Sequence, residues 1–465
     1  MLSHVISMKK ILPVLFCLAM LAGGAALYAQ DASAQAPAAP APEAPAAAPE
    51  AAAAPAPPKI DTGDTAWVLV STALVLLMTA PGVALFYGGM VRSKNALGTI
   101  MQSFIILCLI SIQWVLWGYS LAFGPDIGGI IGSLEWFGLN NVGTTPNADY
   151  AATIPHQAFM LFQMMFAVIT PALITGAFAE RVKFSSFIVF TLLWATFIYD
   201  PLAHWVWGLG GWVRNLGALD FAGGTVVHIS SGIAGLAAAI VVKRRMGHGK
   251  EHMHPHNLPM TLTGAALLWF GWFGFNAGSA LGAGELAAST FTATNTATAA
   301  AALAWMIAEW IYRGKPSALG VASGAVAGLV AITPASGFVG PISGMLIGIG
   351  AGVLCYLAVM LKPLFGYDDA LDAVGVHGVG GIWGALATGL FASKAVNSAG
   401  ADGLFFGNPA QLGIQAMAVL ITVVFVFVGT LIILAVVGGI MGLRVKEEDE
   451  QTGLDLSQHD EKAYS

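Results

Sequence analysis

Long apolar segments follow one another through most of this chain, and they limit its fold more than any other feature. Only 9% of the 465 residues are charged, against about 25% in a soluble domain. Because a chain in lipid must satisfy its own backbone hydrogen bonds, these segments predict an all-α membrane protein with about eleven transmembrane helices. The approximate ranges of the segments are 66–90, 97–123, 156–179, 184–209, 224–242, 259–282, 289–312, 317–333, 341–361, 373–393 and 411–441.

The two ends of the chain differ in character from this apolar part. Two lysines precede a short apolar run over residues 11–27, and small residues follow it. This pattern predicts a secretory signal peptide over residues 1–29, with a retained first helix as the alternative. Residues 30–64 are rich in Ala and Pro and predict a disordered linker. A transmembrane domain then covers residues 65–443, and a polar tail covers residues 444–465.

Positive charges divide unequally between alternate connections. Fourteen Lys and Arg residues fall in one set of loops and in the tail, whereas only Lys59, Arg214 and Lys394 fall in the other set. Loops rich in Lys and Arg stay in the cytoplasm. The bias predicts a multi-pass protein of the inner membrane, with the mature N-terminus outside, the C-terminus in the cytoplasm and an odd number of spans.

A weak internal similarity relates the first segment to the sixth. Residues 72–89 resemble residues 263–278 in their pattern of small, aromatic and glycine residues. Five is an odd number, so segments one to five and six to ten would form two inverted five-helix repeats, followed by a final helix. Transporters often place their pathway at such a repeat interface.

Two histidines lie within apolar segments. His228 belongs to the fifth segment and His377 to the tenth, so they occupy corresponding positions in the two repeats. An ionisable group in hydrocarbon is costly unless it faces the bundle interior and finds a partner. One hypothesis is a pair of imidazoles that hydrogen-bond each other and line one path. The alternative is two separate histidines, each bonded to a backbone carbonyl.

Aromatic residues form a second group. Phe159, Phe162 and Phe166 are spaced by three and four residues, so they share one helix face. Aromatic faces attract a partly desolvated cation, and a serine oxygen accepts a hydrogen bond from it. The alternative is helix packing with an interfacial aromatic belt. The other members of the group are Trp207, Trp212, Trp272, Phe273, Phe275 and Ser279.

Acidic residues stand just before the two segments that carry histidine. Asp220 precedes the fifth segment and Asp372 the tenth. Helix capping is the usual role of such residues, and fixing a loop or attracting cations are the alternatives. Asp368 and Asp369 lie close to Asp372, and simple solvation of all three is a further alternative.

A histidine-rich loop follows the fifth segment, with His248, His252, His254, His256 and one nearby carboxylate, Glu251. Its spacing matches no firm metal motif, so we expect no metal and no cofactor. The chain contains no signature of a nucleotide-binding, metalloprotease or hydrolase site, and no basic block typical of nucleic-acid binding. We therefore expect no catalytic residue and no enzyme activity.

Several short motifs are spread from about residue 65 to the end of the chain. They are residues 81–89 (PGVALFYGG), 176–181 (GAFAER), 220–228 (DFAGGTVVH), 255–259 (PHNLP), 271–279 (GWFGFNAGS), 375–378 (GVHG), 442–445 (GLRV), 453–455 (GLD) and 463–464 (AY). Together they resemble the ammonium transporter family (the Amt/Mep/Rh group), and its bacterial Amt branch best.

The resemblance implies a homotrimer with one pathway per subunit, through which ammonium nitrogen crosses the membrane. The ion would be recruited at an outer aromatic vestibule and deprotonated, and ammonia would pass the twin histidines. The implied site residues are Phe166, Trp207 and Ser279 for recruitment, Phe166 and Phe275 for a gate, His228 and His377 for the pore, and Asp220, Phe162, Tyr199, Trp272 and Asp372 for support.

The tail carries the remaining expectations. Residues 447–450 are acidic and suit basic residues of the cytoplasmic loops, while a solvated tail without function is the alternative. The matching basic residues are Arg181, Lys183, Lys243, Arg244 and Arg245. The resemblance implies a PII-type nitrogen-regulatory trimer as a partner at this face. An ammonium sensor that signals through the tail, and a passive channel for another small solute, are the alternative functions.

Overall fold

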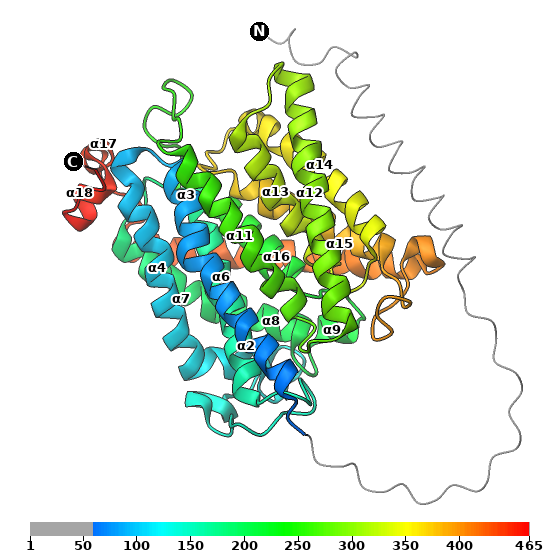
Figure 1. The fold of residues 1–465 in the computed structure, drawn as a ribbon. Helices are drawn as coiled ribbons and strands as arrows, with labels where there is room; N and C mark the ends of the chain where they lie inside the picture. Colours follow the sequence, from blue (N-terminus) through cyan, green and yellow to red (C-terminus); the bar gives the residue numbers. More distant parts are fainter. Residues whose placement is uncertain (1–58, 465) are drawn as a thin grey trace, which may run out of the picture.

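A computed structural model describes residues 59–464, which form a bundle of helices (Figure 1). The expected signal peptide and most of the expected linker lie outside the described residues. In chain order the elements are α2 (Thr62–Leu77), η1 (Met78–Val83), α3 (Ala84–Met90), η2 (Ser93–Asn95), α4 (Ala96–Gln113), η3 (Trp114–Gly118), α5 (Tyr119–Phe123), β1 (Asp126–Ile127), β2 (Ile131–Gly132), η4 (Leu134–Leu139), α6 (His156–Phe178), α7 (Phe184–Trp194), η5 (Ala195–Tyr199), α8 (Asp200–Trp207), α9 (Trp212–Asn215), η6 (Gly224–Ile229), α10 (Ser230–Val242), α11 (Leu258–Gly278), α12 (Glu285–Arg313), α13 (Ala318–Ile332), α14 (Pro341–Phe365), η7 (Val374–Gly378), α15 (Val379–Phe391), η8 (Leu404–Phe406), α16 (Pro409–Met441), α17 (Glu447–Thr452) and α18 (Leu454–His459).

Helices occupy every apolar segment expected from the sequence. Within residues 59–464, nine helices are long and apolar enough to cross a membrane. Two more, α12 and α13, cover the expected segments 289–312 and 317–333. The predicted fold class, a helical membrane protein, is confirmed, while the number of eleven spans stays a prediction.

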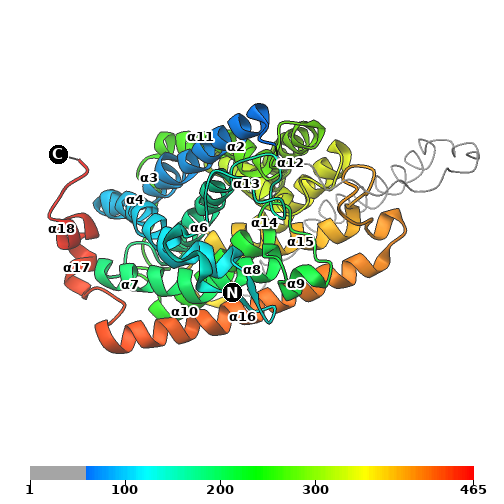
Figure 2. The ribbon, with the colours of Figure 1, turned by 90° about the horizontal axis from the view of Figure 1, so that it is seen from below.

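The helices differ in how deeply they are enclosed. In the most apolar stretch of α6, 89% of the residues are buried inside the protein, against 33% in α16. Figure 2 shows α6 within the bundle and α16 along its outer edge. Much of the apolar surface of α16 is therefore exposed at the edge of the bundle, whereas α6 is enclosed by other helices.

Turns of π-helix interrupt three of the described spans, at η1, η3 and η5, and begin two others, at η6 and η7. Pro81 lies inside η1 and cannot donate a backbone hydrogen bond, which explains that interruption. The turns η6 and η7 carry His228 and His377. Because π-turns are frequent at functional sites, this position singles out the two histidines.

Close backbone contact joins the two segments that carry these histidines. A Cβ atom added to Gly232 of α10 would lie 2.1 Å from the backbone nitrogen of Gly378, so only glycine allows this approach. The fifth segments of the two proposed repeats therefore meet at the middle of the bundle, and their crossing brings His228 close to His377.

The C-terminal tail is folded against the bundle rather than solvated. Its helices α17 and α18 lie beside the start of α4, at the end of the bundle opposite α9 (Figure 1). The carboxylate of Asp455 accepts hydrogen bonds from the backbone N–H groups of Leu97 and Gly98, at 3.1 and 2.8 Å. Lys94 donates to the carbonyl oxygens of Glu450 and Gln451, at 2.9 and 2.6 Å.

The expected partners of the acidic tail residues are wrong in detail. Among residues 59–464, the ion pair of Glu450 lies within the tail, with Arg444 at 2.6 Å, and its other carboxylate oxygen accepts from the backbone N–H of Met246, in the loop after α10, at 2.7 Å. The loop cations have other partners: Arg181 donates to backbone carbonyl oxygens, and Arg245 pairs with Glu180 and Asp368. Contacts within the loops thus satisfy the guanidinium groups on which the expectation relied.

Candidate functional site

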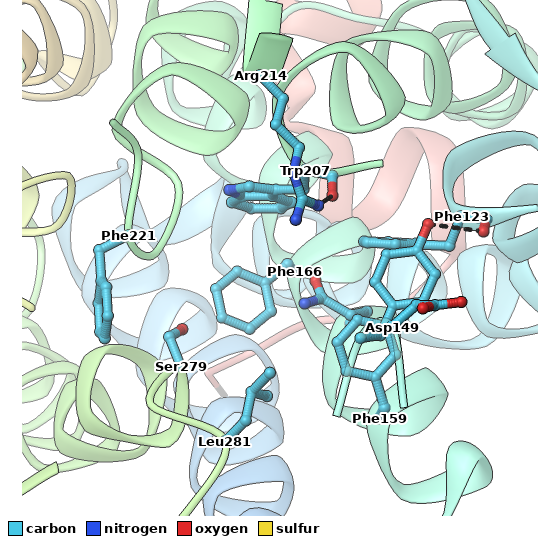
Figure 3. Close-up of a pocket in the computed structure, with 11 residues that line it drawn as sticks. Phe123, Asp149, Phe159, Phe166, Trp207, Arg214, Phe221, Ser279 and Leu281 are labelled. Carbon is cyan, nitrogen blue, oxygen red and sulfur yellow. Dashed lines mark hydrogen bonds between the residues drawn. The ribbon is translucent and has the colours of Figure 1, made fainter. Parts of the chain in front are cut away.

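A small cavity opens at the end of the bundle away from the tail. It holds about 190 Å³, and Figure 3 shows the side chains that line it. They come from α5, α6, α8 and α9, from the loops before α6 and after α9, and from the residues just after α11. The lining residues are Phe123, Asp149, Tyr150, Phe159, Gln163, Phe166, Trp207, Arg214, Phe221, Ser279 and Leu281. The three predicted recruitment residues, Phe166, Trp207 and Ser279, therefore share one cavity.

Hydrogen bonds hold the indole and the serine of this cavity in place. The Trp207 Nε1–H donates to the carbonyl oxygen of Asp220 at 2.9 Å, and Arg214 donates to the carbonyl oxygen of Trp207 at 2.6 Å. The Ser279 hydroxyl donates to the carbonyl oxygen of Phe275 at 2.9 Å, so its own oxygen remains available as an acceptor. The cavity thus combines a fixed aromatic face with an oxygen acceptor.

Gln163 adds a polar group that the sequence did not single out. It lies on α6 between Phe162 and Phe166, and its Oε1 atom is buried without a hydrogen-bond partner in the described part of the chain. A buried acceptor without a partner is costly, so this oxygen is suited to a donor that enters the cavity. A polar residue inside an otherwise apolar and aromatic helix is the signal that could have identified it.

Tyr150 forms a rigid side of the cavity. Its hydroxyl donates to the carbonyl oxygen of Phe123 at 2.9 Å and accepts from the N–H of Leu209 at 3.1 Å. Burial raises the pKa of Tyr150 to about 12, so the phenol is neutral at physiological pH. Its ring stacks on Phe159 at 5.1 Å between centroids, and this contact fixes one aromatic side of the cavity.

A row of aromatic rings leads inward from this cavity. Phe166 meets Trp207 edge-on at 5.8 Å between ring centroids and lies 4.3 Å from Phe275. His228 follows, 6.0 Å from Phe275, and His377 lies 5.5 Å from His228. Phe166, Phe275, His228 and His377 are all buried. The structure therefore brings the predicted gate and pore residues into one continuous line.

The imidazoles of this row have unusual surroundings. Both ring nitrogens of His228 and Nδ1 of His377 are buried without hydrogen-bond partners among residues 59–464. The rings lie nearly parallel, 23° apart, rather than joined through their nitrogens. Neither the mutual hydrogen bond nor the pair of carbonyl contacts considered from the sequence is formed at His228. Its nitrogens therefore have hydrogen-bonding capacity that no described residue uses.

Trp272 and Phe162 flank the row, whereas other predicted aromatic residues lie elsewhere. Trp272 stacks on His228 at 5.3 Å and is fixed by a hydrogen bond to Thr333. Phe162 lies 5.0 Å from Phe166. Tyr199 is buried against Trp114, at 6.2 Å between centroids, and contributes to neither the cavity lining nor the row. Outside the row as well are Trp212, which packs on Trp205, and Phe273, which stacks on Phe291.

Asp220 caps the π-turn that carries His228. Its carboxylate accepts hydrogen bonds from the backbone N–H groups of Gly223, Gly224 and Thr225, at 2.8, 2.6 and 2.8 Å, and from the Thr225 hydroxyl. Gly223 has a φ of 112°, in a region where glycine is favoured, and this lets the chain turn around the carboxylate. The same residue therefore fixes Trp207 through its carbonyl and η6 through its side chain.

Asp369, and not Asp372, has the corresponding position before η7. Its carboxylate accepts from the N–H groups of Ala373 and Val374, at 3.1 and 2.9 Å. Asp372 instead bonds to Lys362 at 2.5 Å. Asp220 precedes His228 by eight residues and Asp369 precedes His377 by eight, which is the sequence signal that identifies the pair.

Solvation of the neighbouring acids is also wrong, because Asp368 and Asp369 are fully buried. Burial raises the pKa of Asp369 to about 6, against the opposing charge of Lys362. Burial acts in the same direction on Asp368, but the hydrogen bonds and charge of Arg245 outweigh it and hold the pKa of Asp368 below its usual range.

The histidine-rich loop does not gather into a metal site in the described part of the chain, where no three His, Cys, Asp or Glu side chains converge. His248 contacts Asp368 at 3.2 Å, and His256 bonds to the carbonyl oxygen of Val91 and to the Tyr464 hydroxyl. His252 stacks on His254. These histidines mainly join loop to loop and loop to tail.

Comparisons with known proteins agree on one family. A sequence model described as "Ammonium Transporter Family" matches residues 66–464. The ammonium transporter of Bacillus subtilis is 57% identical over 404 residues, which is 86% of this chain and 98% of that protein. Ammonium transporter Amt1 of Archaeoglobus fulgidus is 51% identical and covers 87% of this chain and 99% of its own.

Solved structures agree as well. Saccharomyces cerevisiae Mep2 superposes with a TM-score of 0.79 at 37% identity, covering 84% of this chain and 89% of that chain. A structure described as "Sensor Amt Protein" has a TM-score of 0.77 at 33% identity, covering 85% of this chain and 98% of its own.

Proposed function

The chain belongs to the ammonium transporter family, and we propose from this premise that it moves ammonium nitrogen across a membrane. The curated relatives reported above are named as transporters, so the chain is not an enzyme. The observation that supports transport most is the row of rings, which runs from an open cavity to two histidines with unpaired nitrogens.

The cost of charge in a membrane sets the order of events. A bare ion in hydrocarbon costs several kcal/mol or more, whereas neutral ammonia costs far less. Ammonium would bind at the cavity, with its charge against the Trp207 ring and its N–H groups donating to Ser279 and Gln163. These contacts select a small cation that gives up water readily.

Beyond the cavity the species that moves would be ammonia. Phe166 and Phe275, with centroids 4.3 Å apart, leave no room for a hydrated ion and act as a gate whose rings must move. The ion would give up its proton before it passes them, and the proton would follow a separate route. The free nitrogens of His228 and His377 would then bond ammonia as it passes, replacing the water that it has lost.

A sensor is the second candidate function. It is favoured by the similarity to the structure described as "Sensor Amt Protein" and by the tail, whose docked helices could report a change in the bundle. The two functions differ in what crosses the membrane: a sensor binds ammonium at the cavity without passing it on.

The assembly and its setting belong to the same proposal. We place the cavity outside and the tail in the cytoplasm of a bacterial inner membrane, because the loops at the tail end hold most of the Lys and Arg residues. A homotrimer would give each subunit its own row of rings. A PII-type trimer is the partner proposed for the face that carries the tail.

Reconstitution of the purified chain in liposomes tests the function. We expect an ammonium gradient to drive a flux that methylammonium shares and sodium does not, with empty liposomes as the control. A protein that binds ammonium in the same preparation but passes none would be a sensor. If unrelated small solutes cross at the same rate as ammonium, the protein would be a passive channel for small solutes.

A further inference from the structure

A second and larger cavity lies at the end of the bundle that carries the tail. It holds about 870 Å³ and is formed where α10, α14 and α16 end and the tail begins. Figure 2 shows α10 lying along α16, so the cavity borders the outer, lipid-facing side. The lining residues are Ala239, Ile240, Lys243, Arg244, Met246, Phe365, Gly366, Tyr367, Asp368, Arg444, Val445, Lys446 and Glu447.

Positive charge exceeds negative charge in this cavity. Its cations are Lys243, Arg244, Arg444 and Lys446, and its carboxylates are Asp368 and Glu447. Asp368 is already engaged by Arg245 outside the cavity, at 2.8 Å. The ammonium groups of Lys243 and Lys446 are exposed and have no ion pair or hydrogen bond among residues 59–464. The cavity therefore offers unsatisfied donors to an anion.

The backbone of Lys243 is held in an unfavourable conformation. Its φ of 67° and ψ of −174° lie in a region that is populated almost only by glycine. Its carbonyl oxygen accepts a hydrogen bond from the buried Arg181 at 2.8 Å, and this fixes the peptide in that orientation. Glycine would adopt this backbone conformation without strain, so the presence of lysine here indicates that its ammonium group has a role.

The rim of the cavity is apolar. Ile240 of α10 is 49% exposed and Phe365 of α14 is 72% exposed, and both line the cavity at the ends of membrane helices. A soluble anion would gain nothing from these side chains. An acyl chain would cover them and would continue along the helices into the bilayer.

We propose that this cavity binds the headgroup of an anionic phospholipid from the leaflet that faces the tail. The phosphate accepts charge-assisted hydrogen bonds from Lys243 and Lys446, and the first methylene groups of the acyl chains cover Ile240 and Phe365. Because the tail contributes Lys446 to the cavity, the lipid also helps to hold the tail against the bundle. This inference goes beyond ammonium transport and uses none of the residues of the row of rings.

Lipid binding to the purified full-length protein tests the inference. Native mass spectrometry would compare phosphatidic acid with phosphatidylcholine on the wild type and on a variant that carries Lys243→Gly and Lys446→Ala. Glycine suits the backbone at position 243, so this variant loses two charges without added strain. We expect its affinity for phosphatidic acid to fall at least about tenfold, and its weaker binding of phosphatidylcholine to stay unchanged.

A matched control removes two exposed lysines elsewhere on the same side, Lys250→Ala with Lys315→Ala, and should keep the wild-type affinity. An equal loss in the control would mean a diffuse charge effect and would overturn the site, as would wild-type binding by the first variant. Glycerol phosphate competing as well as the lipid would overturn the choice of a phospholipid. If the double variant fails to fold, Lys446→Ala alone should still weaken phosphatidic acid binding, and an unchanged affinity would count against the site.

Discussion

Trp207 is the side chain on which the aromatic cavity depends most. Its indole N–H is used by Asp220 and its carbonyl oxygen by Arg214, so only its ring face is available to a ligand. We expect Trp207→Leu to weaken ammonium affinity by about 2- to 30-fold, since a cation–aromatic contact contributes about 0.5–2 kcal/mol. Concentration-dependent flux in liposomes measures this. Trp212→Leu, outside the cavity, should change the ammonium affinity little. If both variants weaken it equally, the cavity is not the ammonium-binding site.

Gln163 supplies the second prediction at this scale. Its buried Oε1 atom lacks a partner, so an entering ammonium ion would satisfy it. We expect Gln163→Leu to lower ammonium affinity by up to about tenfold, because it removes one acceptor for a charged donor while keeping similar volume. The change should appear in the concentration dependence of the flux, with thermal stability equal to or above that of the wild type. Unaltered affinity would assign Gln163 to packing alone.

The histidines carry the third prediction. Each offers a hydrogen-bonding nitrogen in a buried part of the row, so on the proposed function losing one removes a hydrogen bond to ammonia. We expect His228→Ala and His377→Ala each to lower the flux about three- to tenfold. The variants must insert at wild-type levels for the comparison to hold. If flux and ion selectivity stay at wild-type values in both, the histidines have only a packing role.

Side chains that stand out in an apolar helix were easier to predict than the neighbours they contact. The sequence marks Phe166, Trp207, Phe275 and the histidines because aromatic and ionisable residues are costly or conspicuous in apolar helices. The family resemblance, and not a pattern in the residues, placed Tyr199 beside the path, and its ring packs against Trp114. Spacing along a helix shows which face a residue shares, but not which neighbour that face meets.

At the scale of elements, the two capped π-turns, η6 and η7, hold His228 and His377 close to each other. Asp369 is fully buried and bonds two N–H groups at the start of η7, whereas the Asp372 side chain is 29% exposed and pairs with Lys362. We expect Asp369→Ala to lower stability by about 1–3 kcal/mol, because buried donors lose their acceptor. Asp372→Ala, the matched control, should cost about 1 kcal/mol or less. Thermal unfolding in detergent compares them, and an inverted order would contradict the capping role.

Hydropathy was sufficient to predict the helices but not their internal geometry. Every expected segment is helical, because twenty apolar residues in lipid have few other ways to satisfy their backbone. The π-turns at His228 and His377 left no mark in the apolar pattern, since a π-turn keeps the same composition as the helix around it. The capping acids do have a sequence signal, because Asp220 precedes His228 by the same number of residues as Asp369 precedes His377.

At the scale of the whole molecule, the two ends of the bundle differ in their residues and cavities. One end holds the aromatic cavity, and the other holds the basic loops and the large basic cavity. The docked tail lies at this second end (Figure 1). The sequence predicted that the tail would meet this end, but through its acidic run. The actual contacts are mostly to backbone groups, as at Asp455 and Lys94, and such contacts have no sequence signature of their own.

The tail is docked at one end of the bundle, and its removal is the last prediction. Asp455 caps α4 through the N–H groups of Leu97 and Gly98, and Leu454 donates to the side chain of Asn95 at 2.9 Å. Deleting residues 446–465 leaves these donors and the Asn95 side chain without their partners, and it removes the contact of Glu450 with the N–H of Met246 in the loop after α10. We therefore expect the deletion to lower ammonium flux by about fivefold and to weaken binding of a PII-type protein. Flux in liposomes and pull-down measure the two effects.

Glu447→Gln with Glu448→Gln is the matched control for this deletion. Both residues are exposed tail carboxylates without ion pairs in the described part of the chain, so the variant keeps the docked structure while changing the charge. It should retain wild-type flux. A deletion that matches the wild type in both flux and PII-type binding would mean that the docked tail stabilises α4 but controls nothing. If the control loses as much flux as the deletion, the loss would be due to the missing negative charge of the tail and not to its missing contacts with the bundle.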